Sequence, residues 1–392
     1  MKKVLRGLSF FLLFAILCSC GNRMTIAKQL GKVNRPDSAT ILKYTEKELK
    51  IISGLDSIFA CRVEKTCFNG CVLIAKKGRI IYRKAMGFSD HRTKKELDLN
   101  SSFQLASASK PFTATAVLML AEEGKLKLDD TLQKFIPKFP YKGITVRMLL
   151  CHRSGLPNYM YFASDYFPGS DAPLSNEQVI NCMISNKPAR HDPPNKKFEY
   201  CNTNYCLLAS IIEKASGVRY ADFIQKNIFD ALNMKNSFVL DLVNGKNDHP
   251  HTKGYEGSKW KDAEVNMLDG VLGDKNIFSS VYDMFIFDRA LYTGKLLKPS
   301  TLAEAYKGYS HEKPGARNYG LGWRLMEKRG ERKIIYHNGW WHGYNSLFFR
   351  RPDDETVIIV LCNHNNKSTY QVKDILQVLD NDSTSSDLEK EE

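Results

Sequence analysis

The strand-forming segments of this chain lie near its two ends, and this distribution limits the possible folds more than any other feature. From Gly70, the run GCVLIAKKGRIIYRKAMGFSD predicts two strands joined by a turn at Lys77-Gly78. Near the other end, four more strands are predicted by the consecutive segments GLGWRLMEKRG, RKIIYHNG, YNSLFFRRPD and ETVIIVLCNH. The long middle of the chain, to about residue 276, mixes short helical patterns with aromatic loops.

This order predicts an α/β fold of the α+β type. One antiparallel sheet has to be assembled from both ends of the chain, flanked by helices, with the middle forming an inserted, mostly helical region. With 43% hydrophobic residues over 392 positions, the chain can bury a core of that size. A cleft between the two regions is the natural place for a site. Helical spacing of apolar residues predicts helices over Ser38 to Ala60, Ser107 to Glu123, Thr203 to Ala215, Phe278 to Leu291, and Gln371 to Leu379.

The N-terminal segment has the pattern of an export signal. MKKVLRGLSFFLLFAILCSC begins with positive charges, continues through an apolar run too short for an ordinary membrane span, and ends in small residues and cysteine. Leu17-Cys18-Ser19-Cys20 resembles a bacterial lipobox, which implies cleavage before Cys20 and lipidation of its thiol; a plain cleaved signal or a retained anchor is the alternative. We expect a lipoprotein signal peptide (1–19), a tether (20–40), one large domain (41–380) and a disordered acidic tail (381–392). The mature protein would then be lipid-anchored in a bacterial cell envelope, facing the periplasm or the exterior.

The net charge and the cysteine content limit the kinds of partner, disulfide and metal site that we expect. Without residues 1–19 the formal net charge falls from +14 to +11, and the basic residues are spread over the chain. Behind an export signal this excess fits anionic lipid or an envelope polymer better than nucleic acid, and a diffusely solvated basic surface is the simpler interpretation. Cys61 with Cys67 or Cys71 is the one close cluster that suggests a disulfide. Neither C-x-x-C nor H-E-x-x-H occurs, so we expect no metal and no cofactor.

The segment FQLASASKPF, residues 103–112, holds the strongest chemical candidate. Ser107 stands where an apolar helix is expected to begin, and Lys110 lies on the same helical face, so its amine can reach the serine hydroxyl. The same S-x-x-K spacing occurs at Ser258 and Ser310, but neither of these serines opens a helix. A lysine takes a proton from serine only when it is neutral, which requires burial or a cationic neighbour. The alternative is a serine N-cap beside a solvated lysine.

The segment FEYCNTNYCLL places Tyr200 and Asn202 directly before a predicted helix. A phenol and an amide at this position can relay a proton and orient a carbonyl or amide of a substrate. Y-x-N also occurs at Tyr336, and an Asn N-cap beside a core tyrosine would explain the same residues.

The segment IIYHNGWWHGYNS ends a predicted strand in His337-Asn338-Gly339, the only H-x-G of the chain. Glycine lets another group approach the strand closely, while His337 offers a hydrogen-bond donor or a positive charge. His342, in the adjacent turn, is a competing candidate.

The order and separation of these three motifs resemble the signature of the penicillin-recognising serine hydrolases, the family of serine β-lactamases and penicillin-binding proteins. Three further segments agree: LLCHRSGLPNY (149–159), GDKNIFSSVYDMFIFDRAL (273–291) and YGLGWRL (319–325). The likeness covers about residues 45–380 and is strongest to class C β-lactamases, low-molecular-mass D,D-peptidases and esterases of that fold.

The resemblance implies a β-lactamase-related serine hydrolase domain that forms an acyl-serine on an ester or amide. Ser107 would be the nucleophile, Lys110 its general base and Tyr200 the proton relay to the leaving group. Asn202 would hold the substrate amide. His337 stands where many relatives carry the lysine of K-T-G. Substrate would lie along Gly339 and Trp340, with the backbone amides of Ser107 and Trp340 as oxyanion hole.

Two departures from the family pattern bear on function. Cys201 replaces the small residue in the middle of Y-x-N, and we expect it to be a spectator. H-N-G in place of K-T-G argues against antibiotic hydrolysis, and bulky Trp340 and Trp341 either narrow the cleft or stack on a substrate ring. The substrate is left open between a cell-wall peptide, a small ester and a β-lactam. The rival interpretation is a catalytically silent lipoprotein that binds wall peptides or a protein partner.

Overall fold

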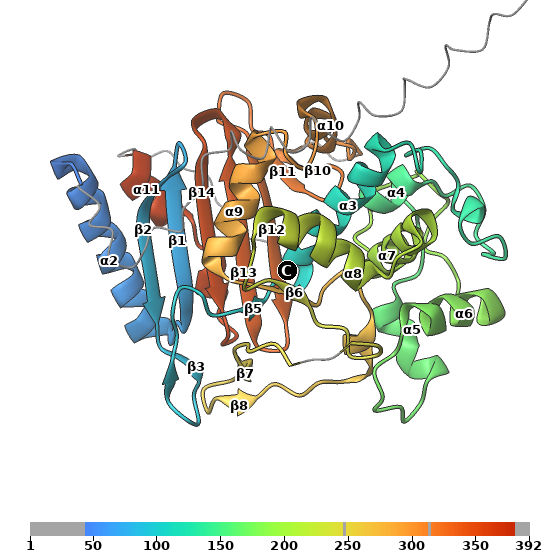
Figure 1. Ribbon diagram of the computed structural model, residues 1–392, viewed down its shortest axis with the longest axis horizontal. Helices are drawn as coiled ribbons and strands as arrows, with labels where there is room; N and C mark the ends of the chain where they lie inside the picture. Colours follow the sequence, from blue (N-terminus) through green and yellow to red (C-terminus); the bar gives the residue numbers. More distant parts are fainter. Residues whose placement is uncertain (1–43, 246–247, 313–314, 381–392) are drawn as a thin grey trace, which may run out of the picture. The chain divides into compact units, whose positions relative to one another are not determined.

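A seven-stranded antiparallel sheet in the order β10-β11-β12-β13-β14-β1-β2 forms the centre of the fold (Figure 1). β14 lies beside β1, with Gly70 opposite Cys362, so the sheet joins the start and the end of the chain as predicted. The strands are β1 (Gly70–Lys76), β2 (Arg79–Met86), β10 (Arg317–Tyr319), β11 (Arg324–Met326), β12 (Ile334–Trp341), β13 (Tyr344–Arg351) and β14 (Thr356–Cys362).

The computed structural model describes residues 44–245, 248–312 and 315–380, all within one compact unit that begins at Tyr44. The predicted signal peptide, Cys20, the tether and the acidic tail lie outside the described residues. No helix among the described residues is both long enough and apolar enough to cross a membrane.

The central strands are buried on both faces. β13 and β14 are buried along their whole length because helices cover the sheet on each side. Alternate residues of a strand point to opposite faces: Leu73 and Ile359 belong to the larger core, on the side of the inserted helices, whereas Val72 and Ile358 belong to a smaller core on the other side. α2 (Glu46–Thr66) and α11 (Lys373–Asp380) pack on the smaller core.

Local sequence explains the first hairpin and the first helix. Lys77 and Gly78 both adopt positive φ, 49° and 73°, which suits a two-residue turn between twisted antiparallel strands. The side chain of Thr45 caps α2 by accepting from the amide of Glu48, and the Glu48 side chain accepts from the amide of Thr45 in return. α2 therefore begins at Glu46, eight residues after the predicted start at Ser38.

The inserted region is mostly helical, as predicted. The helix predicted over residues 203–215 is α7, which ends at Ser216 and is followed by Gly217 as C-cap with φ of 74°. The helix predicted from Phe278 starts later, because Phe278 belongs to β9 and pairs with β5 and β6; Ser280 then caps α9. The remaining helices and strands are α3 (Lys110–Glu122), α4 (Val146–Leu150), α5 (Tyr159–Tyr166), α6 (Asn176–Asn186), α7 (Asn202–Ser216), α8 (Tyr220–Ile224), α9 (Val281–Tyr292), α10 (Pro299–Ala305), β3 (Phe88–Asp90), β4 (Lys95–Glu96), β5 (Phe103–Gln104), β6 (Phe238–Val239), β7 (Tyr255–Glu256), β8 (Lys261–Asp262) and β9 (Ile277–Ser279).

Candidate active site

Ser107 lies in a tight turn between β5 and α3. Residues 106–109 form a single 3₁₀ turn, and the α-helix proper begins at Lys110 rather than at Ser107. Ala106 holds the turn with φ of 49°, a conformation that costs energy for a residue with a side chain. β9 fixes the turn from the side, because the Leu105 amide donates to the Ile277 carbonyl at 2.8 Å and the Ile277 amide donates to Ser109 Oγ at 3.2 Å.

Lys110 is fully buried, and its amine touches the Ser107 hydroxyl. Nζ lies 3.0 Å from Ser107 Oγ, 2.8 Å from Asn202 Oδ1 and 3.0 Å from the carbonyl oxygen of Asp274. All three partners are uncharged. A serine N-cap beside a solvated lysine is therefore wrong, since the lysine has no solvent exposure and Ser107 caps no helix.

Y-x-N brings Tyr200 and Asn202 to the same amine. Asn202 is the first residue of α7, and Cys201, not Asn202, occupies the N-cap position. The Lys110 amine lies 4.9 Å from the centre of the Tyr200 ring. The Tyr200 hydroxyl oxygen has no hydrogen-bond partner among the described residues, although protein atoms cover it. The structure thus brings Ser107, Lys110, Tyr200 and Asn202 together.

Cys201 faces away from this group. Its sulfur points toward the carbonyl oxygens of Leu156 and Pro157, at 3.5 and 3.7 Å. Burial raises the pKa of the Cys201 thiol to about 11, so the thiol stays protonated near neutral pH. Both observations agree with a spectator.

His337 lies behind Tyr200 rather than at the cleft surface. Its side chain is fully buried, Nδ1–H donates to the Asn338 carbonyl oxygen at 2.8 Å, and Nε2 accepts from the Tyr319 hydroxyl at 3.0 Å. Burial, followed by the nearby positive charge of Arg324, holds the pKa of His337 well below its ordinary value. Both ring nitrogens therefore have protein partners, and the lowered pKa disfavours the positively charged form of the two options from the sequence.

Gly339 is where strand β12 meets the nucleophile. A Cβ built on Gly339 would lie 2.1 Å from the Leu105 carbonyl oxygen and 2.9 Å from the Ser107 amide nitrogen, so only glycine fits. The backbone amides predicted to form the oxyanion hole belong to Ser107 and to Trp340, the residue after Gly339. The competing His342 turns elsewhere, with Nε2 at 3.0 Å from Asp269 Oδ2.

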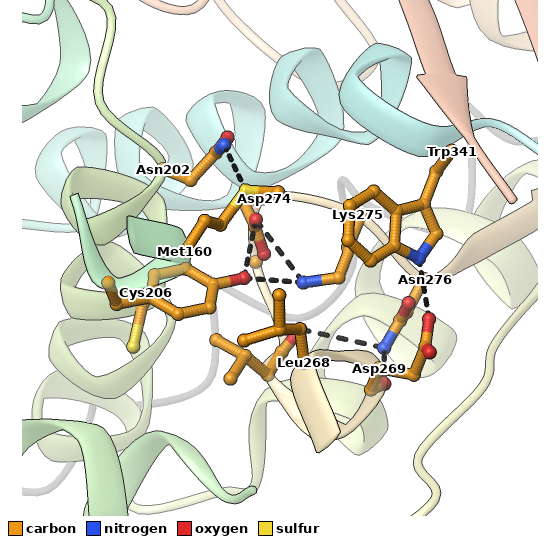
Figure 2. A network of polar contacts seen from close by, with 12 residues as sticks. Met160, Asn202, Cys206, Leu268, Asp269, Asp274, Lys275, Asn276 and Trp341 are labelled. Atoms are coloured by element: carbon orange, nitrogen blue, oxygen red, sulfur yellow. Dashed lines mark hydrogen bonds and ion pairs between the residues drawn. The ribbon is translucent and has the colours of Figure 1, made fainter. Parts of the chain in front are cut away.

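The two tryptophans point to opposite sides, as successive residues of a strand must. Trp340 is 57% exposed, whereas Trp341 is 8% exposed and donates from Nε1 to Asp269 Oδ1 (Figure 2). Trp340 is therefore the one of the pair that is accessible to a ligand, and Trp341 fixes β12 to the loop before β9.

Comparison with known proteins identifies the family. A model of the beta-lactamase family matches residues 55–382. The chain belongs to this family. Its members are serine hydrolases that act through an acyl-enzyme, which agrees with the predicted family and fold.

Individual relatives give a finer comparison. Penicillin-binding protein 4* of Bacillus subtilis (strain 168) is 35% identical over 331 residues, covering 81% of this chain and 73% of the relative. The octameric penicillin-binding protein homologue from Pyrococcus abyssi superposes with a TM-score of 0.69 at 26% identity, covering 80% of this chain and 73% of the other. The D-amino acid amidase from Ochrobactrum anthropi SV3 shares the fold, with a TM-score of 0.72 at 24% identity over 86% of this chain and 99% of its own.

The segment 273–277 contributes groups that sequence reasoning missed. The Asp274 carbonyl oxygen accepts from Lys110, while its buried carboxylate Oδ2 accepts from the Tyr159 hydroxyl at 2.9 Å. Figure 2 shows the buried amine of Lys275 directed at the same carboxylate, and this amine also donates to the Tyr159 hydroxyl. Gly273, with φ of 103° and α7 too close for a Cβ, lets the segment approach. In the sequence, Gly273-Asp274-Lys275-Asn276 is distinguished only as the start of the segment 273–291 that resembles the family.

His152 was also missed, although it stands in the segment LLCHRSGLPNY. Its ring lies 4.3 Å from the Tyr200 ring, and Nδ1 accepts from the Cys201 amide at 3.1 Å. Burial lowers the pKa of His152 well below its ordinary value, which agrees with an Nδ1 that accepts a hydrogen bond. It supports Tyr200 by packing.

The cysteine and metal expectations concern other parts of the chain. Cys61, Cys67 and Cys71 are free thiols, so the suspected disulfide is absent from the described residues. Within the described ranges, no group of three or more His, Cys, Asp or Glu side chains is arranged to hold a metal ion.

Proposed function

We propose that this protein is an envelope-anchored hydrolase that cleaves an ester or amide through an acyl-serine on Ser107. The observation that carries the proposal is the placement of the Lys110 amine. It is fully buried, 3.0 Å from Ser107 Oγ, and its other two contacts are oxygens of Asn202 and Asp274 that can only accept hydrogen bonds. In the proposed base form, the two N–H groups of the amine donate to these two oxygens and its lone pair faces the serine hydroxyl.

The proposed acylation uses Lys110 as the base and Tyr200 as the proton relay. Ser107 Oγ attacks the substrate carbonyl carbon as its proton passes to Lys110 Nζ, and the carbonyl oxygen becomes an oxyanion between the amides of Ser107 and Trp340. Tyr200 gives its hydroxyl proton to the leaving group and regains one from Lys110 as the acyl bond to Ser107 forms and the bond to the leaving group breaks. The unpartnered Tyr200 hydroxyl supports this assignment.

Deacylation reverses the roles. Tyr200 takes a proton from a water molecule as it passes its own hydroxyl proton to Lys110, and the water oxygen attacks the ester carbonyl of the acyl-serine. Lys110 then returns this proton to Ser107 Oγ as the bond between Ser107 and the acyl group breaks and the acid product leaves. Asn202 orients the acyl group through its amide NH₂.

For substrate class, we favour acylated amino-acid esters and amides such as wall peptides over β-lactams. The fold shared with the D-amino acid amidase from Ochrobactrum anthropi SV3 supports an amino-acid amide as substrate. His337 stands in place of a lysine, is fully buried and has a lowered pKa, so it offers a drug carboxylate no positive charge. This supports the preference for other substrates over β-lactams.

The test uses purified protein with a fluorophosphonate, a fluorescent penicillin, a D-alanyl-D-alanine peptide and a 4-nitrophenyl ester. We expect a covalent adduct on Ser107 that is lost in Ser107→Ala and kept in Ser258→Ala, whose serine belongs to another S-x-x-K. Labelling absent from the wild type, or surviving in Ser107→Ala, would overturn the enzyme and leave the silent binding protein.

Anchoring is tested separately through Cys20. Cells expressing the full chain are fed an alkyne fatty acid, and the protein is recovered and its N-terminal peptide weighed. We expect a lipid-bearing peptide that begins at Cys20 in the wild type and no lipid in Cys20→Ala. An unmodified mature N-terminus in the wild type would refute the anchor.

A further inference from the structure

The side-chain amide of Asn202 is divided between two partners. Its Oδ1 accepts from Lys110, which turns Nδ2 to the opposite side, where it contacts Met160 Sδ. Figure 2 shows Met160 and Asn202 pointing toward each other. Because the lysine occupies the oxygen, the NH₂ group is the part of Asn202 left for a ligand, and in the free protein a thioether covers it.

The backbone of Met160 is held firmly against α7. The Met160 amide donates to Asn158 Oδ1 at 3.3 Å as part of the cap of α5, and the Tyr159 amide donates to Thr203 Oγ1 at 2.7 Å. The methionine side chain itself has three rotatable bonds, and both Met160 and Asn202 are only half-buried. The sulfur can therefore swing away from the amide without any movement of the helices.

Thioether sulfur is a weak hydrogen-bond acceptor, and a carbonyl oxygen is a strong one. A substrate whose acyl group carries a carbonyl beyond the scissile bond can replace the sulfur at Asn202 Nδ2. An alkyl acyl group of the same length offers nothing to replace it. Displacing the thioether therefore gains hydrogen-bond energy only for the acyl group that carries the second carbonyl.

We propose that Met160 is a specificity-determining residue. Its sulfur covers the amide donor of Asn202 and is displaced by substrates whose acyl group carries a second carbonyl. This inference rests on the proposed acylation of Ser107. It extends that function by assigning a residue of α5 to the choice of acyl group.

The test compares two 4-nitrophenyl esters, of N-acetylglycine and of pentanoic acid, which have acyl chains of equal length with and without the extra carbonyl. The variants are Met160→Leu, which removes the acceptor at similar volume, and Met160→Gln, which supplies a stronger one. Met86→Leu is the matched control, since Met86 is also half-buried but packs on the smaller core. Active molecules are counted with a fluorophosphonate, so that kcat/KM refers to folded enzyme.

The measured ratio is kcat/KM for the N-acetylglycine ester divided by kcat/KM for the pentanoic ester. Met160→Leu is expected to raise this ratio about three-fold, the effect of removing a weak competing hydrogen bond. Met160→Gln is expected to lower the ratio by a similar factor, and Met86→Leu to leave it unchanged. A ratio that stays constant in both Met160 variants, or moves in the same direction in both, overturns the inference. If no ester is turned over and no probe labels the wild type, it is the proposed function that fails.

Discussion

Replacing Gly339 by alanine tests whether strand β12 and the nucleophile turn form one rigid catalytic unit. The added Cβ would lie 2.1 Å from the Leu105 carbonyl oxygen, a distance that must open to at least 3.0 Å. The strand and the turn therefore have to separate by about 1 Å, which is enough to misplace a preorganised oxyanion donor. Such a displacement typically costs on the order of 100-fold in rate.

Gly70→Ala is the matched control for this variant. A Cβ on Gly70 would also lie 2.1 Å from a carbonyl oxygen, that of Leu361, but Gly70 is on β1, separated from β12 by β13 and β14. Both variants should lose about 1–3 kcal/mol of stability through overpacking.

The assay is single-turnover acylation by a 4-nitrophenyl ester, expressed per active molecule, beside the urea midpoint of each variant. We expect the rate to fall only in Gly339→Ala. A Gly339→Ala enzyme within about three-fold of the wild-type rate would refute the reasoning, given a typical effect of about 100-fold. An equal loss in Gly70→Ala would trace the effect to stability.

Three further predictions concern residues around the same site. Lys110→Met should slow fluorophosphonate labelling of Ser107 by about 100-fold or more, because it removes the general base, and a wild-type labelling rate would contradict that assignment. Cys201→Ser should keep kcat/KM within about three-fold, because the thiol is neutral and faces the Leu156 carbonyl; lost activity would make Cys201 a participant. His337 has a lowered pKa in the folded state, so only the unfolded chain protonates this residue as the pH falls below about 6.5. The free energy of unfolding therefore decreases toward acid pH. Urea unfolding of the wild type should therefore show a steeper loss of stability toward acid than His337→Gln, by up to about 1.4 kcal/mol per pH unit, and equal slopes would refute the buried neutral histidine.

The sheet and the nucleophile pair were predictable because each depends on local pattern. Continuous apolar runs at both ends of the chain leave few ways to bury β14 and β1 other than side by side. Ser107 and Lys110 are three residues apart, and the 3₁₀ turn before α3 keeps their side chains on the same side, as an α-helical turn would. Of the three S-x-x-K motifs, only this one precedes an apolar helical pattern, which distinguishes it from the other two.

The rest of the site depends on contacts that no local pattern carries. The Asp274 contact to Lys110 uses a backbone carbonyl, which has no residue signature. His337 on β12 is covered by Tyr319 of β10, two strands away in the sheet, and no local pattern links these two residues. Phe278 was predicted as helix because an apolar run is ambiguous between helix and strand until its pairing partners, β5 and β6, are known.

The most direct test of the central claim is the mass of the protein during turnover of a D-amino-acid ester. Acid-quenched samples, digested and sequenced, should show one acyl group added to the peptide that contains Ser107, formed in the wild type and strongly delayed in Lys110→Met. A burst of product with no acyl group on Ser107, or an acyl group on another residue, would contradict the account.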